Sequence, residues 1–358
     1  MQEILDPYLP QWRVPSAKAG GIAVVSQGAG IQNLRTTTLP ALPPPGPHEI
    51  IIDVLSVCLN HRDIFGINGT RKGGWIPCSD AVGRVVAIGS KVKRVELNDR
   101  VCPIFSQNYL LDSDRKDAFS LGNTRGIPGT LCKKLLLSEE NVVHVPDHLS
   151  DEEASTLPCA GVTAWRALVT EGRFKKGETV LVEGTGGVSA FGAQFANALG
   201  GKVICTSSSD SKLKRVKQLL SVKHTINYNK NPDWGNVAKS QFGGADHVLE
   251  IGGAGTFKQA LVALNNHGSL AVIGILDGIE TSLNLVQFFS KQIRMNGIAV
   301  GSRKDFEDMN KCIAEHRIRP LVSAVFPMSQ ACEAFKLMEG GGFIGQIVVS
   351  MNKPVSKL

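Results

Sequence analysis

The pattern of apolar positions divides the chain into two regions. From Gly21 to about Val145, short apolar runs are separated by turn residues, as in EIIIDVLSVCL, AVGRVVAIGS and NVVHVPDHL. From about Ser155 to residue 300, apolar runs alternate with segments whose apolar residues recur at helical spacing. The first pattern predicts a β-rich domain, and the second predicts a parallel sheet whose strands are joined by helices.

The second region predicts a doubly wound α/β fold. Its strand candidates are TVLVEG, KVICTS, HTINY, ADHVLEIGG, GSLAVIGIL and IRMNGIAVG, and SAFGAQFANALG and SKLKRVKQLL are helices between them. A helix at DFEDMNKCIAEHRI and a strand at GQIVVS follow this region. Residues 107–129 of the first region lack periodicity, so we expect a long loop there, and loops of that length often border a functional site.

Length and composition fit an α/β protein of two domains. The 358 residues exceed what one compact core usually serves, and the chain is 42% hydrophobic and 20% charged, with 38 glycines. The chain has neither a basic start followed by an apolar stretch nor a run of 18 apolar residues, so we expect it to be neither secreted nor membrane-spanning. Its eight cysteines form no C-x-x-C pair, which favours reduced thiols over a disulfide framework.

The charge is moderately basic, with 39 basic and 32 acidic residues and a net charge of +7. The basic residues are scattered, except for a run over residues 212–217 that we interpret as a solvated helix face or a phosphate contact. Because no basic stripe with interleaved aromatic residues is present, we expect no nucleic-acid partner.

The last three residues, Ser356, Lys357 and Leu358, read S-K-L. This ending is a peroxisomal signal that an import receptor reads at the extreme C-terminus. We therefore expect a peroxisomal location and a contact with that receptor; the alternative is a tail packed out of the receptor's reach.

A glycine-rich turn, GTGGVS, follows the apolar strand at residues 180–183 and leads directly into an amphipathic helix. Such a strand, turn and helix bind dinucleotides, because glycines let backbone amides approach the pyrophosphate and the helix N-terminus supplies further N–H donors. Ser189 replaces the third glycine of the full pattern. The candidate contacts are Gly184, Thr185, Gly186, Gly187 and Val188.

The next strand indicates NADPH rather than NADH. An NAD site places an acid about 20 residues after the glycines, whereas this strand ends in Ser207 and Ser208, with Lys212 one helical turn beyond. Hydroxyls and a lysine attract a 2′-phosphate that a carboxylate would repel. Asp210 weighs against this choice, and the serines can also cap the next helix.

The chain resembles the medium-chain dehydrogenase/reductase superfamily, in its zinc-independent quinone-oxidoreductase-like or zinc-type alcohol-dehydrogenase-like branch. The segments that carry the resemblance are CLNHRDIFGINGT, CSDAVGRVVAIGSKVKRVELNDRV, TLPCAGVTAWRAL, LVEGTGGVSAFGAQFANALG, SSSDSKL, HTINY and AVGSRKDFEDMNKCIAEHRIRPLV. The resemblance implies a GroES-like catalytic domain over residues 1–155 and 302–358, a Rossmann NADPH-binding domain over residues 156–301, a shared cleft between them, and a homodimer.

The resemblance also implies further cofactor contacts. Tyr228 would lie near the adenosine, and Thr163 would lie under the nicotinamide ring. The other candidates are Gly252 and, near the nicotinamide, Gly274, Ile275, Val300 and Gly301.

The positions that hold catalytic zinc in the family align with Asn60, Ser79 and Cys159. A catalytic zinc needs three Cys, His or carboxylate ligands, so this set indicates a zinc-independent protein. Without a metal, hydrogen-bond donors must stabilise a developing oxyanion. The candidate catalytic residues are Asn60, His61, Arg62 and Asp63. Of these, His61 is the candidate for polarising a carbonyl or delivering a proton, unless it is structural, and Arg62 and Asp63 fit an internal ion pair.

These features together favour hydride transfer from NADPH to a small activated acceptor: an enone or enoyl thioester, a quinone, or an aldehyde or ketone. Two alternatives stay open. They are a zinc-dependent alcohol dehydrogenase and a non-catalytic NADPH-binding protein on the same fold.

Overall fold

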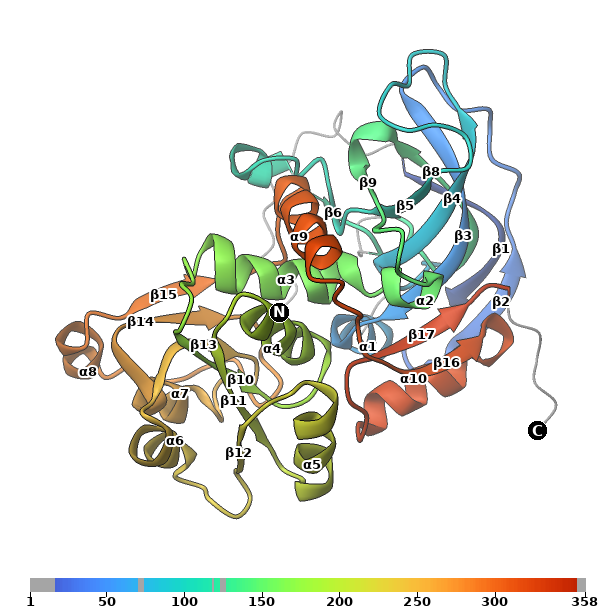
Figure 1. Cartoon of the computed structure of the whole chain (residues 1–358). Coiled ribbons are helices and arrows are strands. Elements are labelled where there is room, and N and C mark those ends of the chain that lie inside the picture. The colour runs from blue at the N-terminus through green and yellow to red at the C-terminus, as the bar shows by residue number, and fades with distance from the viewer. Residues whose placement is uncertain (1–16, 70–73, 118, 123–126, 353–358) are drawn as a thin grey trace.

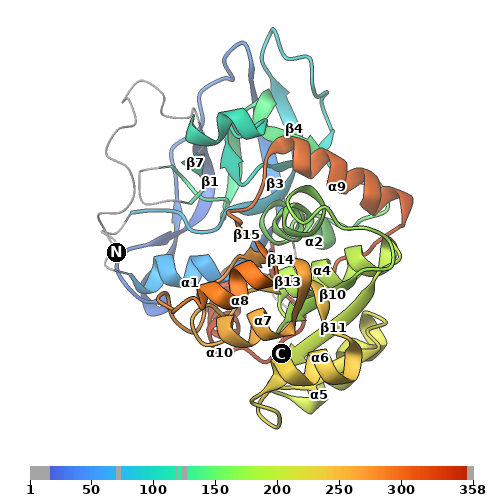
Figure 2. The same ribbon diagram turned by 90° about the vertical axis from the view of Figure 1, so that its left-hand side faces the viewer.

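The computed structural model describes residues 17–69, 74–117, 119–122 and 127–352. Its two large sheets lie at separate ends of the molecule. In Figure 2 the strands β1, β3 and β4 are in the upper part, and the strands β10, β11 and β13 with helices α6 and α7 are in the lower part. In the described part of the chain, no helix is both long and apolar enough to cross a bilayer.

The first sheet has nine strands and is mainly antiparallel, which confirms the predicted GroES-like β-rich domain. Its order is β2-β1-β8-β3-β4-β5-β9, and the C-terminal strands β16 and β17 join it through β3. The strands are β1 (Lys18–Ser26), β2 (Leu34–Thr38), β3 (Glu49–Leu59), β4 (Asp80–Ile88), β5 (Arg100–Pro103), β8 (Cys132–Ser138), β9 (Val142–His144), β16 (Val322–Pro327) and β17 (Gln346–Ser350). The short helices of this region are η2 (Ile31–Asn33), α1 (His61–Asn68), η4 (Glu139–Asn141), α2 (Asp151–Ala154), η7 (Met328–Gln330) and α10 (Ala331–Gly340).

The second sheet has six parallel strands in the order β12-β11-β10-β13-β14-β15. Chain order therefore reverses between β10 and β13, as in a Rossmann fold. The strands are β10 (Thr179–Glu183), β11 (Lys202–Ser207), β12 (His224–Asn227), β13 (Ala245–Glu250), β14 (Leu264–Val272) and β15 (Arg294–Gly297). The helices between them are α4 (Gly187–Ala198), α5 (Asp210–Leu219), α6 (Trp234–Phe242), α7 (Phe257–Ala263) and α8 (Leu285–Ser290).

Alternate residues of the buried strands face different helices, as period-two side-chain geometry requires. Val180 and Val182 of β10 belong to the apolar cluster that contains Phe191 of α4, whereas Leu181 packs in the cluster of Trp234 of α6. Both faces of this sheet are therefore covered by helices.

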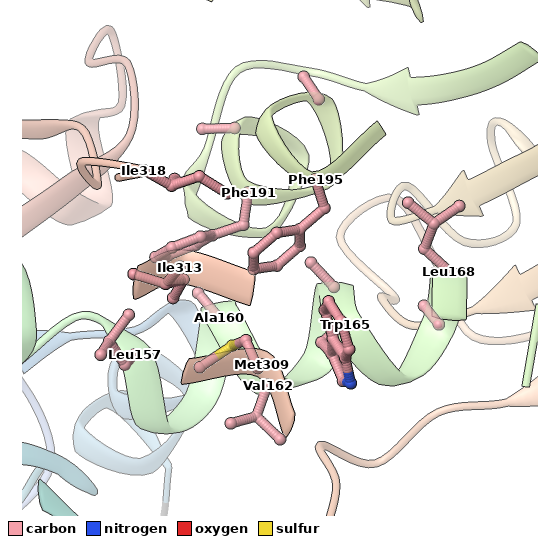
Figure 3. Packing of buried hydrophobic residues seen from close by; sticks show 14 of the residues in the cluster. Leu157, Ala160, Val162, Trp165, Leu168, Phe191, Phe195, Met309, Ile313 and Ile318 are labelled. Atoms are coloured by element: carbon pink, nitrogen blue, oxygen red, sulfur yellow. The ribbon is translucent and has the colours of Figure 1, made fainter. Parts of the chain in front are cut away.

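A helical segment joins the two sheets. It comprises η5 (Leu157–Gly161), α3 (Val162–Trp165) and η6 (Arg166–Thr170), and it packs against α4 and α9 (Arg303–Glu315). Figure 3 shows this packing, in which Trp165 meets Phe195 edge-on at 5.5 Å between ring centroids and Met309 of α9 lies beside Ala160. The same apolar cluster includes Val82 and Cys102 of the first sheet, so this cluster extends into both parts of the molecule. Figure 1 shows α3 and α9 between the two large sheets.

The predicted long loop at residues 107–129 is mostly irregular where the structure describes it. It does contain a short helix, η3 (Asp112–Asp117), and a strand, β7 (Phe119–Ser120), that pairs with β6 (Ser106–Gln107). The loop packs on α9, because Arg303 N donates to Tyr109 O at 2.8 Å.

Candidate functional site

The glycine turn connects β10 to α4 at the point where chain order reverses in the second sheet. Gly184 has a φ of 74°, a conformation that favours glycine, and Gly186 precedes the first residue of α4. A Cβ added at Gly186 would meet no atom within 4 Å. At Gly187 it would come within 2.3 Å of the Gln346 side chain. A side chain at Gly187 would therefore displace the Gln346 amide, whereas Gly186 borders open space.

The segment before β17 fixes this turn from the other domain. Gly345 N donates to Thr185 O at 2.8 Å, and Thr185 Oγ1 donates to Phe343 O at 3.2 Å. Gln346 is 4% exposed, and its buried Nε2 has no hydrogen-bond partner in the described structure. A donor without a partner beside an amide-rich turn suits an anionic ligand. No sequence pattern indicates a role for Gln346, because its nearness to the turn depends on how the two domains pack.

The end of β11 contains the candidate 2′-phosphate contacts. Ser207 is buried, whereas Ser208 and Lys212 are half-buried and reach solvent. Ser209 Oγ accepts a hydrogen bond from Lys212 N at 3.4 Å, so a serine of this run does cap α5. Tyr228, which is 36% exposed, is tied to this strand end because its N–H donates to Ser207 O at 3.1 Å.

Asp210, the acid that weighs against NADPH, has partners of its own. Its carboxylate lies 2.5 Å from Lys230 Nζ and accepts a hydrogen bond from Asn227 Nδ2 at 2.6 Å. The hydrogen bond from Lys230 lowers the pKa of Asp210, so the group is ionised and its charge is balanced locally.

A second turn follows β13 and lies beside the glycine turn. Gly252 N donates to Glu183 Oε2 at 3.2 Å, and Gly274 N donates to Glu250 O at 3.2 Å. A Cβ at Gly274 would lie 2.1 Å from Ile251 O, so only glycine fits there. Ile275, the next residue, is exposed. The structure thus brings these three candidates together with the glycine turn.

Thr163, Val300 and Gly301 form a separate group at the junction between the helical segment and α9. Thr163 is buried in α3, and a Cβ at Gly301 would come within 2.8 Å of the neighbouring Val162 side chain. Val300 has a φ of 61°, which is unusual for a β-branched residue. Val300 and Phe191 of α4 belong to the same apolar cluster, which links this group to the helix of the glycine turn.

Asn60, Ser79 and Cys159, the aligned zinc positions, surround Asp80. Ser79 Oγ donates to Asp80 Oδ1 at 2.7 Å, and Cys159 N donates to Oδ2 at 2.8 Å. Burial raises the pKa of Asp80 to about 7, although hydrogen bonds from Ser79, Cys159 N and Asn60 lower it. Asp80 is not among the predicted site residues, and its only signal in the sequence is that of an acid at the start of an apolar run.

These residues do not fit a catalytic zinc. Asn60 and Ser79 offer an amide and a hydroxyl, and desolvation followed by the nearby Asp80 raises the pKa of the Cys159 thiol well above its usual value. A catalytic zinc needs three Cys, His or carboxylate ligands, and of these three residues only Cys159 is of that kind. Within residues 17–352, as far as the structure describes them, no three His, Cys, Asp or Glu side chains are placed to hold a metal ion.

The start of α1 arranges the other candidate catalytic residues. Asp63 Oδ2 accepts a hydrogen bond from Asn60 N at 2.8 Å, and Arg62 lies 3.3 Å from Asp63 Oδ1, which is the predicted ion pair. Arg62 also donates to Leu121 O at 3.2 Å, so this pair anchors the long loop. His61 is exposed, its ring is edge-on to Phe65, and desolvation lowers its pKa, so the imidazole is neutral at pH 7. The Ser356–Leu358 ending lies outside the described residues.

Two family models match the chain. The alcohol dehydrogenase GroES-like domain matches residues 46–147, and the zinc-binding dehydrogenase domain matches residues 187–315. A zinc-type alcohol dehydrogenase-like protein of Schizosaccharomyces pombe is 38% identical over 320 residues, which cover 86% of this chain and 92% of that protein.

Two further relatives bear on the chemistry. An acryloyl-coenzyme A reductase of Sulfurisphaera tokodaii is 28% identical over 86% of this chain and 93% of its own length. A solved NAD-dependent alcohol dehydrogenase superposes with a TM-score of 0.84 at 29% identity, covering 92% of this chain and all of that one. With the fold, the two matched domains and these relatives in agreement, the chain belongs to the medium-chain dehydrogenase/reductase superfamily, whose oxidoreductases use a nicotinamide cofactor.

Proposed function

We propose that the protein transfers hydride from NADPH to a small activated carbonyl compound without zinc. The observation that carries this proposal is the open space at Gly186, next to backbone amides and the start of a 12-residue helix. A pyrophosphate placed there would accept hydrogen bonds from those amides and would meet the positive end of the helix dipole. The bound nicotinamide would supply the hydride.

The preference for NADPH rests on the end of β11. Ser208 and Lys212 reach solvent there, and the charge of the nearby Asp210 is balanced by Lys230. A 2′-phosphate would gain a charge-assisted contact with Lys212 and meet little uncompensated negative charge. The NAD-dependent relative shows that the opposite preference also occurs on this fold, so selectivity needs its own test.

The proposed acceptor is an α,β-unsaturated carbonyl or enoyl thioester, with quinones and simple aldehydes or ketones as the other members of the class. The acryloyl-coenzyme A reductase relative supports the thioester. At the substrate, the neutral His61 imidazole would donate its N–H to the oxygen on which negative charge develops. Arg62 and Asp63 would hold α1 and the long loop in place for this contact.

Zinc independence is proposed from the chemistry of Asn60, Ser79 and Cys159, described above. The rival enzyme is a zinc-dependent alcohol dehydrogenase, and metal analysis of the purified protein separates the two: stoichiometric zinc would reject the zinc-independent proposal. The other rival, a non-catalytic NADPH-binding protein, predicts tight cofactor binding with no NADPH oxidation on any enone, thioester, quinone or aldehyde.

A thermal-shift comparison tests the cofactor assignment. At equal concentration NADPH should raise the melting temperature more than NADH, because ligand stabilisation follows affinity. Lys212→Ala should reduce the NADPH shift and leave the NADH shift unchanged, while Lys336→Ala, an exposed lysine on α10, should change neither. Equal shifts for both nucleotides in the wild type would reject the phosphate selectivity.

We also propose a homodimer formed through the β15 edge of the second sheet. Within the described chain, β15 pairs only with β14, and the adjacent helix α8 exposes Leu285, Val286 and Phe289 by 63% or more. A sheet edge can pair with its own copy across a two-fold axis, and a large exposed apolar patch indicates an interface. The peroxisomal location stays a prediction.

A further inference from the structure

Two glutamates lie side by side beneath the proposed cofactor site. Glu183 is the last residue of β10 and Glu250 is the last residue of β13, and these parallel strands are neighbours in the second sheet (Figure 1). Glu183 is 6% exposed and Glu250 is fully buried. Each glutamate is followed at once by a glycine-containing turn, residues 184–187 after β10 and residues 251–253 after β13.

Each carboxyl group uses one oxygen to hold the second turn. Glu183 Oε2 accepts hydrogen bonds from Ile251 N at 3.1 Å and Gly252 N at 3.2 Å. Glu250 Oε1 accepts from Gly253 N at 2.9 Å and from the Thr256 hydroxyl. In the described structure the other two oxygens, Glu183 Oε1 and Glu250 Oε2, are buried without a hydrogen-bond partner.

Two ionised carboxylates are unfavourable in this position. Burial, followed by the charge of Glu250, raises the pKa of Glu183 to about 8, and burial also raises the pKa of Glu250. Thr256, before α7, donates its hydroxyl to Glu250, and Thr206 of β11 is the cross-strand neighbour of Glu183. On the opposite face of β11 the Cys205 thiol donates to Gly184 O, and burial raises its pKa to about 12, so it stays neutral. Among the described residues, no Lys, Arg or His acts on either carboxyl.

We propose that Glu183 and Glu250 share one proton, and that this proton holds the turn at residues 251–253 against the glycine turn at residues 184–187. A proton between Glu183 Oε1 and Glu250 Oε2 satisfies both oxygens that otherwise lack partners. The two glutamates are positioning residues, because they hold the amides of the second turn, and Glu183 leads directly into the glycine turn, without touching the reacting atoms. The link to cofactor binding rests on the function proposed above.

The shared proton makes stability depend on pH in one direction. In the folded protein Glu183 binds its proton more tightly than in the unfolded chain, where the pKa is near 4.5. The stabilisation is therefore complete below about pH 4.5 and is lost as the pH rises to about 8. Above that pH both carboxylates are charged, and repulsion should separate the two turns.

Urea unfolding of the cofactor-free protein across pH 5 to 9 tests the shared proton. Glu183→Gln keeps a neutral group that can donate to Glu250 Oε2 and still accept from the two amides. The unfolding constant of the wild type, divided by that of Glu183→Gln, should rise with pH by up to about tenfold per unit until about pH 8 and then level off. Glu280→Gln removes an exposed charge from the same domain and should give a ratio that does not change with pH. Parallel curves for the wild type and Glu183→Gln would overturn the proposal.

Two further readouts keep the test decisive. If Glu183→Gln does not fold, Glu250→Gln replaces it, because removing either carboxyl group abolishes the shared proton. Infrared difference spectra should show a protonated carboxyl band in the wild type at pH 7 that both variants lack, and the absence of this band in the wild type would also overturn the proposal.

Cofactor titrations separate this inference from the proposed function. NADPH affinity should fall severalfold between pH 7 and pH 9 in the wild type and stay constant in Glu183→Gln. An affinity loss of equal size in both proteins would overturn the positioning role. If neither protein binds NADPH or NADH at any pH, the proposed function fails, while the unfolding and infrared results still decide whether the proton is shared.

Discussion

His61 is the side chain on which the proposed chemistry depends most. It is exposed at the start of α1, whereas its neighbours Arg62 and Asp63 are occupied by contacts that hold the loop. His61→Phe should lower kcat by about a hundredfold, because the developing oxyanion loses its hydrogen-bond donor. The KM for NADPH should stay within about twofold, since the histidine is separate from the glycine turn. Steady-state kinetics with an enone check this, and an unchanged kcat would assign His61 a structural role.

Residues whose role follows from local chain geometry could be predicted, and residues whose role follows from distant packing could not. Gly184 and the ion pair of Arg62 with Asp63 depend on near neighbours in the chain, and the structure has both. Burial raises the pKa of Asp80, and the residue buried beside it, Cys159, whose N–H donates to the Asp80 carboxyl and lowers that pKa, lies 79 residues away. Gln346 meets Gly187 only because two domains pack together. The residues that flank Asp80 and Gln346 in the sequence therefore do not predict these two environments.

At the scale of elements, Arg166 joins three segments. Its guanidinium lies 2.7 Å from Asp112 of η3, 2.6 Å from Glu171 after η6 and 2.8 Å from Asp305 of α9. Arg166→Ala would leave the buried Asp305 without its cation and should cost about 3 kcal/mol of unfolding free energy. Urea denaturation measures this, with Lys336→Ala expected within about 0.5 kcal/mol of the wild type. A loss below about 1 kcal/mol would show that Ser302 and Thr170 alone satisfy Asp305.

The strands were predicted well because buried parallel strands give continuous apolar runs bounded by turns. Each of the six strands of the second sheet overlaps its predicted run, although β14 begins earlier than predicted, at Leu264. The short elements η3 and β7 were not predicted, because each depends on contacts with other segments rather than on its own periodicity. The π-type turns of the segment from Leu157 to Thr170 were also missed, since their apolar spacing resembles that of an ordinary helix.

At the scale of the whole molecule, the proposed dimer depends on the exposed face of α8. Phe289→Asp places a charge in the centre of this apolar patch and should convert a two-chain species into a single chain in light scattering after gel filtration. Leu219→Asp places the same charge on an exposed leucine of α5, outside the α8 patch, and should leave the dimer intact. A wild type that runs as a single chain would reject the dimer.

The central claim is that the glycine turn holds the cofactor, and Gly186 tests it most directly. Its φ of −73° and ψ of −175° suit any residue, and a Cβ there meets no protein atom within 4 Å, so Gly186→Val should fold normally. The added side chain would occupy the space proposed for the pyrophosphate and should weaken NADPH binding by at least about tenfold in calorimetric titration. An added Cβ at Gly340 of α10 also meets no atom within 4 Å, so the Gly340→Val protein should bind NADPH like the wild type. Unchanged affinity in a folded Gly186→Val protein would contradict the account.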